Sequence, residues 1–191
     1  SGNAGYTMQI YAAHVGALDV SSSYIGNSYP VRVLPDEVEQ DAVWQNIDTD
    51  YLIKGTVDVK HPTDPVLTIS DGVTMYFEYD GMFRTGNGAV PGQMIIDGHT
   101  DGVLFTSDQT SPVPGDLSGI VIGSSDSGSF IDGLTLEYGA RAINGAITSY
   151  SSLATVQNTT ITDSEDWGIY CNSGAQLTLS NISYFLVISR N

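Results

Sequence analysis

Short apolar segments that begin with glycine recur in the second half of this chain at a nearly constant spacing. Gly119–Ile122, Gly145–Thr148 and Gly168–Cys171 start 26 and then 23 residues apart. A period of this length is typical of repeat proteins, in which one short unit stacks on the next. The repeat therefore limits the fold more strongly than any single motif does.

A second apolar series shares this spacing. Ile131, Val156 and Leu179 are 25 and 23 residues apart, and each is followed five positions later by another apolar residue. Two series in register predict a parallel β-solenoid, because each coil (a rung) buries its inward side chains only when another rung stacks on it. The expected inward columns are Ile120, Ile147 and Ile169, and Leu136, Ile161 and Tyr184.

The composition agrees with an almost all-β chain. Glycine makes up 21 of the 191 residues, or about 11% against roughly 7% in average proteins, which indicates frequent turns. Between the glycines lie short segments rich in Val, Ile, Leu, Tyr and Thr, such as Val66–Ile69 and Val73–Phe77, and these are predicted strands. The best helix candidate is Asp36–Trp44, which carries carboxylates in its first turn.

Two asparagines occupy equivalent places in consecutive rungs. Asn158 and Asn181 follow Val156 and Leu179 by two residues, where the preceding rung has Gly133. Asn and Gly suit left-handed corners, and stacked Asn side chains can hydrogen-bond along a solenoid axis. Both also begin N-x-[ST] patterns that formally match a glycosylation acceptor. We favour the corner interpretation.

Several further segments occur in a familiar order. They are Trp44 followed by Tyr51–Val57, then Leu67–Val73, Gly98–Ser107, Leu117–Ile120 and Ile131–Gly139. Over roughly residues 44–185 this order resembles the secreted right-handed parallel β-helix proteins of bacteria, relatives in fold of pectate lyases, although Asp71 stands where that family usually has proline. The resemblance implies a right-handed parallel β-helix and an extracellular or cell-surface location. It does not fix an activity, because such helices occur in adhesins, cell-surface proteins and lyases.

Two regions are expected from this pattern. Residues 1–45 show no rung spacing and are predicted to form a β-rich N-terminal cap, and residues 46–191 are predicted to form a helix of about six rungs. The stretch 182–189 is apolar and β-prone, and an uncovered rung recruits another strand. We expect this stretch to be covered either by folding back or by a second chain in a homo-oligomer.

The net negative charge of the chain argues against nucleic acids as partners. The chain has 22 acidic and 6 basic residues, for a net charge of −16, and its basic residues are scattered, so nucleic-acid binding is not expected. No apolar run approaches about 18 residues, so no membrane insertion is expected. The single cysteine, Cys171, allows no internal disulfide.

The sharpest candidate for chemistry is Asp97-Gly-His99-Thr-Asp101, whose side chains at alternate positions would share one face of a strand. Acid/base catalysis or metal binding would need such groups. The bracketing Asp-Gly pairs favour a solvated turn instead. Arg141 would be the basic partner if these residues formed an active site.

Calcium is the ion that the many carboxylates would suit best. The densest candidate loop is Asp163, Glu165 and Asp166, before Trp167. No twelve-residue calcium loop is present. Dense carboxylates are also the ordinary solvated face of an acidic protein.

These observations favour a non-catalytic structural or recognition (adhesive) module of an exported or cell-surface protein, with a glycan or a surface protein as its ligand. The alternative is a carbohydrate-active enzyme or glycan-binding domain of the pectate-lyase fold. Its first candidate residues are Asp97, His99, Asp101 and Arg141.

Overall fold

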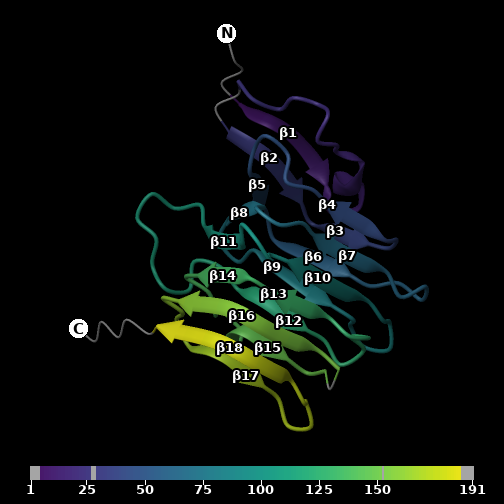
Figure 1. The fold of residues 1–191 in the computed structure, drawn as a ribbon, viewed down its shortest axis with the longest axis vertical. Coiled ribbons are helices and arrows are strands. Elements are labelled where there is room, and N and C mark those ends of the chain that lie inside the picture. The colour runs from purple at the N-terminus through teal and green to yellow at the C-terminus, as the bar shows by residue number, and fades with distance from the viewer. Residues whose placement is uncertain (1–4, 27–28, 152, 186–191) are drawn as a thin grey trace.

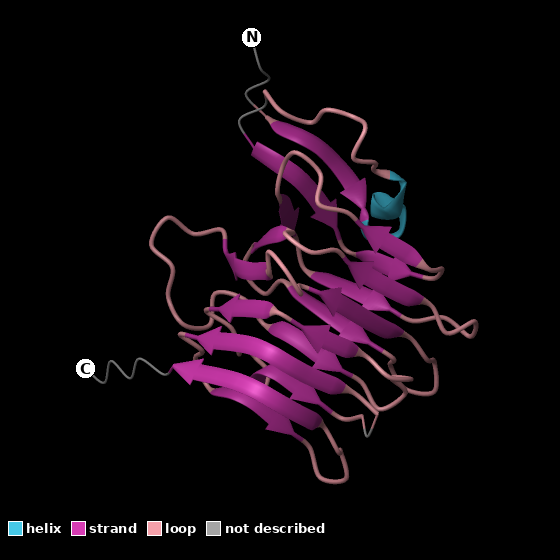
Figure 2. Cartoon of the chain, viewed as in Figure 1, coloured by secondary structure: helices cyan, strands magenta, loops and turns pink. Residues whose placement is uncertain are grey.

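The chain forms a parallel β-solenoid of about seven turns with almost no helix, in a computed structural model that describes residues 5–26, 29–151 and 153–185 (Figures 1 and 2). This confirms the predicted all-β fold, and the expected number of about six rungs is close to the observed one. All pairings between the named strands are parallel.

The strands form three ladders along the solenoid axis. The first ladder contains β4 (Ala42–Trp44), β7 (Val66–Ile69), β10 (Gln93–Asp97), β13 (Phe130–Asp132) and β16 (Thr155–Thr162). The second contains β1 (Tyr6–Tyr11), β2 (Tyr29–Leu34), β5 (Tyr51–Ile53), β8 (Thr74–Phe77), β11 (Val103–Ser107) and β14 (Leu134–Glu137), and it also ends on β16. The third contains β3 (Asp36–Val38), β6 (Thr56–Val59), β9 (Met82–Thr85), β12 (Gly119–Ile122), β15 (Gly145–Ser149) and β17 (Trp167–Cys171). The last strand, β18 (Thr178–Phe185), pairs with β16 and spans the first two ladders.

The predicted columns are confirmed by the strand register. Ile120 pairs with Ile147, which pairs with Ile169, and the second predicted column is equally continuous from Leu136 through Ile161 to Tyr184. The first ladder carries a longer column, which runs Trp44, Ile69, Ile96, Ile131, Val156 and Leu179. All but the last of its members are buried.

Aromatic side chains from all three ladders meet in the middle rungs. The ring centroids of Phe77 and Phe105 lie 5.1 Å apart, and those of Phe83 and Phe105 lie 5.5 Å apart. Trp44 approaches Phe83 at 5.5 Å with an edge-on geometry. Burial of each such side chain contributes roughly 1.5–3 kcal/mol, so this cluster ties the ladders into one core.

The helix predicted over Asp36–Trp44 is wrong, because this segment forms β3 and β4. Val38 pairs with Val59 and Trp44 pairs with Ile69, and both Val38 and Trp44 are buried. Pairing with the next rung therefore overrides the local helical signal. Within the described residues the one helical element is a 3-10 helix, η1 (Ala12–Ala17).

Parallel pairing also runs through the region expected to be a cap. β1 pairs with β2, β2 with β5, and β4 with β7. The predicted boundary at residue 45 thus falls inside the ladders, next to Trp44. Ala12 and Val15 of η1 are buried in the core, so η1 covers the N-terminal end of the stack.

The other end of the stack is open over the part of the chain that the structure describes. There β18 pairs with β16 alone, and Leu179 and Tyr184 are 47% and 43% exposed. Residues 186–189 of the predicted association segment 182–189 lie outside the described residues, so association remains a prediction. No helix among the described residues is long and apolar enough to cross a membrane.

Candidate functional site

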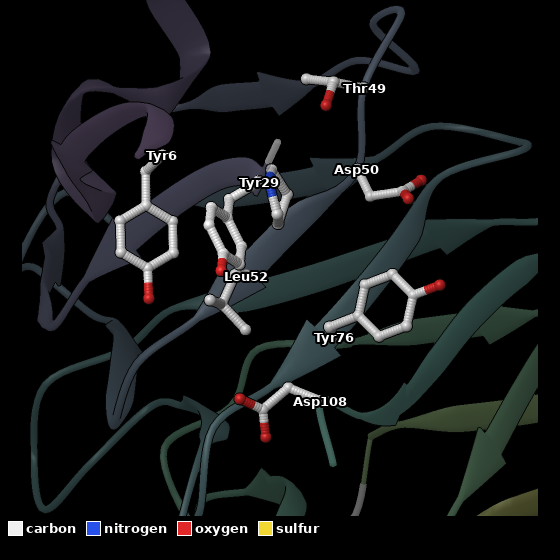
Figure 3. A pocket seen from close by; sticks show the side chains of 8 residues that line it. Tyr6, Tyr29, Thr49, Asp50, Leu52, Tyr76 and Asp108 are labelled. Atoms are coloured by element: carbon white, nitrogen blue, oxygen red, sulfur yellow. The ribbon is translucent and has the colours of Figure 1, made fainter. Parts of the chain in front are cut away.

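A cleft of about 370 Å³ lies beside the second ladder near the N-terminal end of the stack (Figure 3). It crosses four strands that are consecutive in the sheet, β1, β2, β5 and β8. Two loops complete it, one just before β5 and one just after β11. Its lining residues are Tyr6, Tyr29, Pro30, Thr49, Asp50, Leu52, Tyr76 and Asp108.

The ladder register fixes the aromatic part of the cleft. Tyr6 pairs with Tyr29, and their ring centroids lie 5.4 Å apart at an angle of 50°. The hydroxyl of Thr7 donates to the Tyr29 carbonyl at 2.7 Å and holds the two strands together at this point. Leu52 pairs with Tyr76, which alternates with buried Met75 and Phe77 and so points outward. The strand pairing therefore restricts the movement of the backbone at these tyrosines.

Two carboxylates give the cleft its charge. Figure 3 shows Asp50 and Asp108 with Tyr76 between them. Among the described residues neither carboxylate forms an ion pair, and Asp108 accepts a hydrogen bond from the Gln109 side-chain amide at 2.5 Å. Burial raises the pKa of the Asp50 carboxyl above its ordinary value, because a desolvated carboxylate is costly to ionise.

The cation beside the Tyr6 ring is already paired with a carboxylate. The Arg32 guanidinium lies 5.0 Å from the centre of the Tyr6 ring. Its Nη2 and Nε both contact Oε1 of Glu78, at 2.5 and 2.6 Å. The exposed ring of Tyr29 and the half-buried rings of Tyr6 and Tyr76 can stack on an apolar face of a ligand, and the two carboxylates, which form no ion pair among the described residues, can accept its hydrogen bonds.

The structure places the predicted catalytic segment at the corner between β10 and β11. Asp97, His99 and Asp101 are all exposed there. Nδ1 of His99 is 3.9 Å from Oδ2 of Asp132, but the His99 side chain is 80% exposed. The backbone N–H groups at 100–102 donate to the Asp71 carboxylate. The segment is thus a corner held by the neighbouring rung.

Arg141 lies elsewhere, in the connection between β14 and β15. Its Nε is 2.7 Å from Oδ1 of Asp80, its Nη1 donates to the Gly115 carbonyl at 3.2 Å, and its guanidinium lies 3.6 Å from the centre of the Tyr79 ring. None of these partners belongs to the 97–101 corner. The four residues proposed for an enzyme site are therefore not brought together by these contacts.

The predicted metal ligands do not form a binding group. Among the described residues no three His, Cys, Asp or Glu side chains are placed so that they could hold a metal ion. Asp163, Glu165 and Asp166 are within the residues searched. Glu165 is instead tied to the previous rung through its backbone N–H, which donates to the Gly139 carbonyl at 2.9 Å.

A buried carboxylate in the connection between β12 and β13 has a structural role. Asp126 is 4% exposed and accepts hydrogen bonds from the hydroxyls of Thr85 at 2.6 Å and Ser129 at 2.5 Å. The backbone N–H groups of Gly128 and Ser129 also donate to it, at 3.0 and 2.8 Å. Since both oxygens are satisfied from within the chain, this carboxylate stabilises a corner and offers no open site.

None of the residues that line the cleft was predicted from the sequence to be functional. The signal that could have found part of it is the 23-residue spacing between Tyr6 and Tyr29, which continues the repeat into the N-terminal region. No comparable signal marks Asp50 or Asp108, because both lie in loops whose position depends on the stacking of distant rungs. Tyr76 falls within a predicted strand, but nothing in the sequence distinguishes it as a residue of the cleft.

Comparison of the chain with protein-family models, with curated proteins and with solved structures gave no match. The parallel β-helix implied by the sequence motifs is confirmed by the strand pairing. Kinship with pectate lyases, secretion and a bacterial origin remain predictions. The fold and the geometry of the cleft are therefore the basis for assigning a function.

Proposed function

We propose that this chain is a non-catalytic recognition module of an exported or cell-surface protein and that it binds a glycan in the cleft near the N-terminal end of the stack. The observation that supports this most directly is the composition of the cleft. It combines the rings of Tyr6, Tyr29 and Tyr76 with the carboxylates of Asp50 and Asp108.

Such a lining suits a sugar for two reasons. The apolar face of a sugar ring packs against an aromatic ring, and Tyr adds a hydroxyl that can hydrogen-bond at its edge. Carboxylates accept hydrogen bonds from sugar hydroxyls and fix the ligand's orientation, as the few polar groups of ligand sites commonly do. The cleft crosses three rung intervals of about 4.8 Å each, roughly 14 Å in all, which is enough for a short oligosaccharide.

The exposure of Tyr29 supports a role for this ring in binding a ligand rather than in stabilising the core. Tyr29 is 52% exposed, although it lies beside a core that buries other large side chains completely. Both carboxylates of the cleft lack an ion-pair partner among the described residues, whereas Glu78, nearby, is paired with Arg32. Groups left unpaired on a rigid frame are preorganised for a ligand.

Two further points bear on this proposal. The enzyme alternative is the weaker one, because the contacts of Arg141 and those of the 97–101 corner involve different residues. An extracellular or cell-surface location is supported by the sequence resemblance and by the strongly acidic composition.

A glycan array probed with the labelled protein tests the proposal. We expect selective binding, with a loss of about tenfold or more in the double variant Tyr29→Ala and Tyr76→Ala, since each ring stack is worth about 1 kcal/mol. The matched control is Tyr150→Ala, because Tyr150 is 40% exposed and lies outside the cleft. Absence of binding to every glycan, or an equal loss in the control, would contradict the proposal.

Incubating the protein with polygalacturonate and calcium distinguishes a non-catalytic module from a lyase. We expect no unsaturated product. Product whose release stops in Arg141→Ala or Asp101→Ala would favour the enzyme alternative.

A further inference from the structure

We infer that the cleft selects glycans that carry protonated amino groups, so that its ligand class is the amino sugars in their non-acetylated form. The inference rests on the proposed function and specifies the chemistry of the ligand. Its starting point is that the lining contains two Asp residues and no Lys, Arg or His. An unpaired carboxylate is stabilised far more by an ammonium group than by a neutral hydroxyl.

The negative charge of the cleft is not cancelled by a basic residue in its lining. Four of the five described Lys and Arg side chains form ion pairs within the fold: Arg32 with Glu78, Lys60 with Glu37, Arg84 with Asp58 and Arg141 with Asp80. The fifth, Lys54, forms no ion pair among the described residues, and it is not one of the residues that line the cleft. The chain as a whole has a net charge of −16. Acidic sugars would therefore be repelled from the cleft and cationic ones attracted.

Asp50 is the group expected to anchor the ammonium. Asp50 is exposed, and its carboxylate forms neither an ion pair nor a side-chain hydrogen bond among the described residues. Such a carboxylate is free to accept charge-assisted hydrogen bonds from an ammonium group, which are stronger than those from a neutral hydroxyl. Asp108, which lies at the other side of Tyr76 in Figure 3, provides a second negative charge along the same path.

The tyrosine rings add to this preference. An aromatic face attracts a cation electrostatically, most strongly when water is excluded. The fold already uses this interaction in the same place, since Arg32 lies over the Tyr6 ring at 5.0 Å. Tyr29 and Tyr76 have no cation over their rings among the described residues. They can therefore pack against both the apolar ring of an amino sugar and its ammonium group.

Titration calorimetry with two oligosaccharides of equal length tests the inference, one of glucosamine and one of N-acetylglucosamine. The two differ only in whether the amine is free or acetylated, and the measurement is made at about pH 6, above the ordinary carboxyl range. We expect the glucosamine oligomer to bind at least about tenfold more tightly. We expect Asp50→Asn to reduce this preference to less than about threefold.

Asp166→Asn is the control variant, because it removes the same charge from an exposed residue outside the cleft. An equal loss in Asp50→Asn and Asp166→Asn would overturn the inference, since the attraction would then come from net charge alone. Equal or tighter binding of the acetylated oligomer would overturn the inference and leave the proposed function standing. Absence of binding to either oligomer would overturn the inference, and the glycan array would then decide the proposed function. A lysine oligomer that binds as tightly as glucosamine would show a general cation site and contradict the sugar assignment.

Discussion

The side-chain amide of Asn181 donates from Nδ2 to Oδ1 of Asn158 at 2.7 Å, from one rung to the next. Both residues have left-handed backbone, with φ of 50° and 48°. Asn158 in turn donates from Nδ2 to Oδ1 of Asp132, also at 2.7 Å. The corner therefore carries a continuous chain of hydrogen bonds along the axis, as the repeat of asparagine predicts.

Replacing Asn158 tests what this corner contributes to stability. Asn158→Ala loses two hydrogen bonds and also leaves a residue with Cβ in the left-handed region, which costs about 1–2 kcal/mol. Asn158→Gly loses the same hydrogen bonds without that backbone cost. We therefore expect urea unfolding to show Asn158→Ala about 1 kcal/mol less stable than Asn158→Gly. Equal stabilities would mean that the backbone conformation of this corner carries no penalty.

One inward column offers a matched pair of positions at different depths in the stack. Val156 is fully buried, whereas Leu179, the next member, is 47% exposed. A buried unpaired charge costs several kcal/mol of a total stability of about 5–15 kcal/mol. We expect Val156→Asp to unfold the domain. Leu179→Asp should shift the thermal midpoint, measured by circular dichroism, by only a few degrees if nothing covers the last described rung.

The Leu179→Asp variant also tests association. If Leu179→Asp is as damaging as Val156→Asp, the last described rung is covered, as association through residues 182–189 requires. Light scattering on the wild-type protein then identifies whether the cover is a second chain.

Asp71 should make stability depend on pH. Burial raises the pKa of its carboxyl, but the N–H groups of Asp101, Thr100, Gly102 and Gly72 outweigh this, and the pKa lies below its ordinary value of 3.8. A carboxyl whose pKa is lowered by folding stabilises the fold above its unfolded pKa, and this contribution is lost as the pH falls through the folded pKa. We expect the wild type to exceed Asp71→Asn in unfolding free energy at neutral pH.

That difference should shrink below about pH 4 and vanish once Asp71 is protonated in the native state. Unfolding curves at several pH values measure it. A difference that stays constant down to strongly acidic pH would show that the charge of Asp71 does not contribute.

The contribution of Asp50 to stability should depend on pH in the opposite way to that of Asp71. Burial raises the pKa of its carboxyl, so the ionised form is disfavoured in the folded state and the cost is present above the folded pKa. Asp50→Asn is therefore expected to raise the melting temperature at neutral pH, and the gain should disappear below the unfolded pKa of about 4. The same variant is expected to lose selective binding of amino sugars. A variant that is both less stable and unchanged in binding would contradict the role assigned to Asp50.

The repeat made the fold predictable, because inward columns follow directly from spacing. Ile131, Val156 and Leu179 could be aligned from the sequence, and the register confirms the alignment. The pairing between rungs was harder to predict in the N-terminal part of the chain, where no repeat had been recognised. Asp36–Trp44 shows a helical pattern locally but forms two strands, since Val38 and Trp44 each add to an existing ladder.

The cleft could not be predicted for a different reason. Its carboxylates lie in loops before β5 and after β11, and Asp50 and Asp108 line one cleft only because the rungs of β5, β8 and β11 stack on one another. Asp71 shows the same limit on a smaller scale. Its role in holding the adjacent corner becomes visible only in the structure, where its carboxylate accepts the N–H groups of Asp101 and Gly102.

The most direct test of the central claim is a map of amide and side-chain NMR shifts on adding the glucosamine oligomer to the wild-type protein. The account predicts that the perturbed residues cluster at Tyr6, Tyr29, Asp50, Tyr76 and Asp108. Perturbations centred on the 97–101 corner, or spread over the acidic surface without a maximum at the cleft, would contradict it.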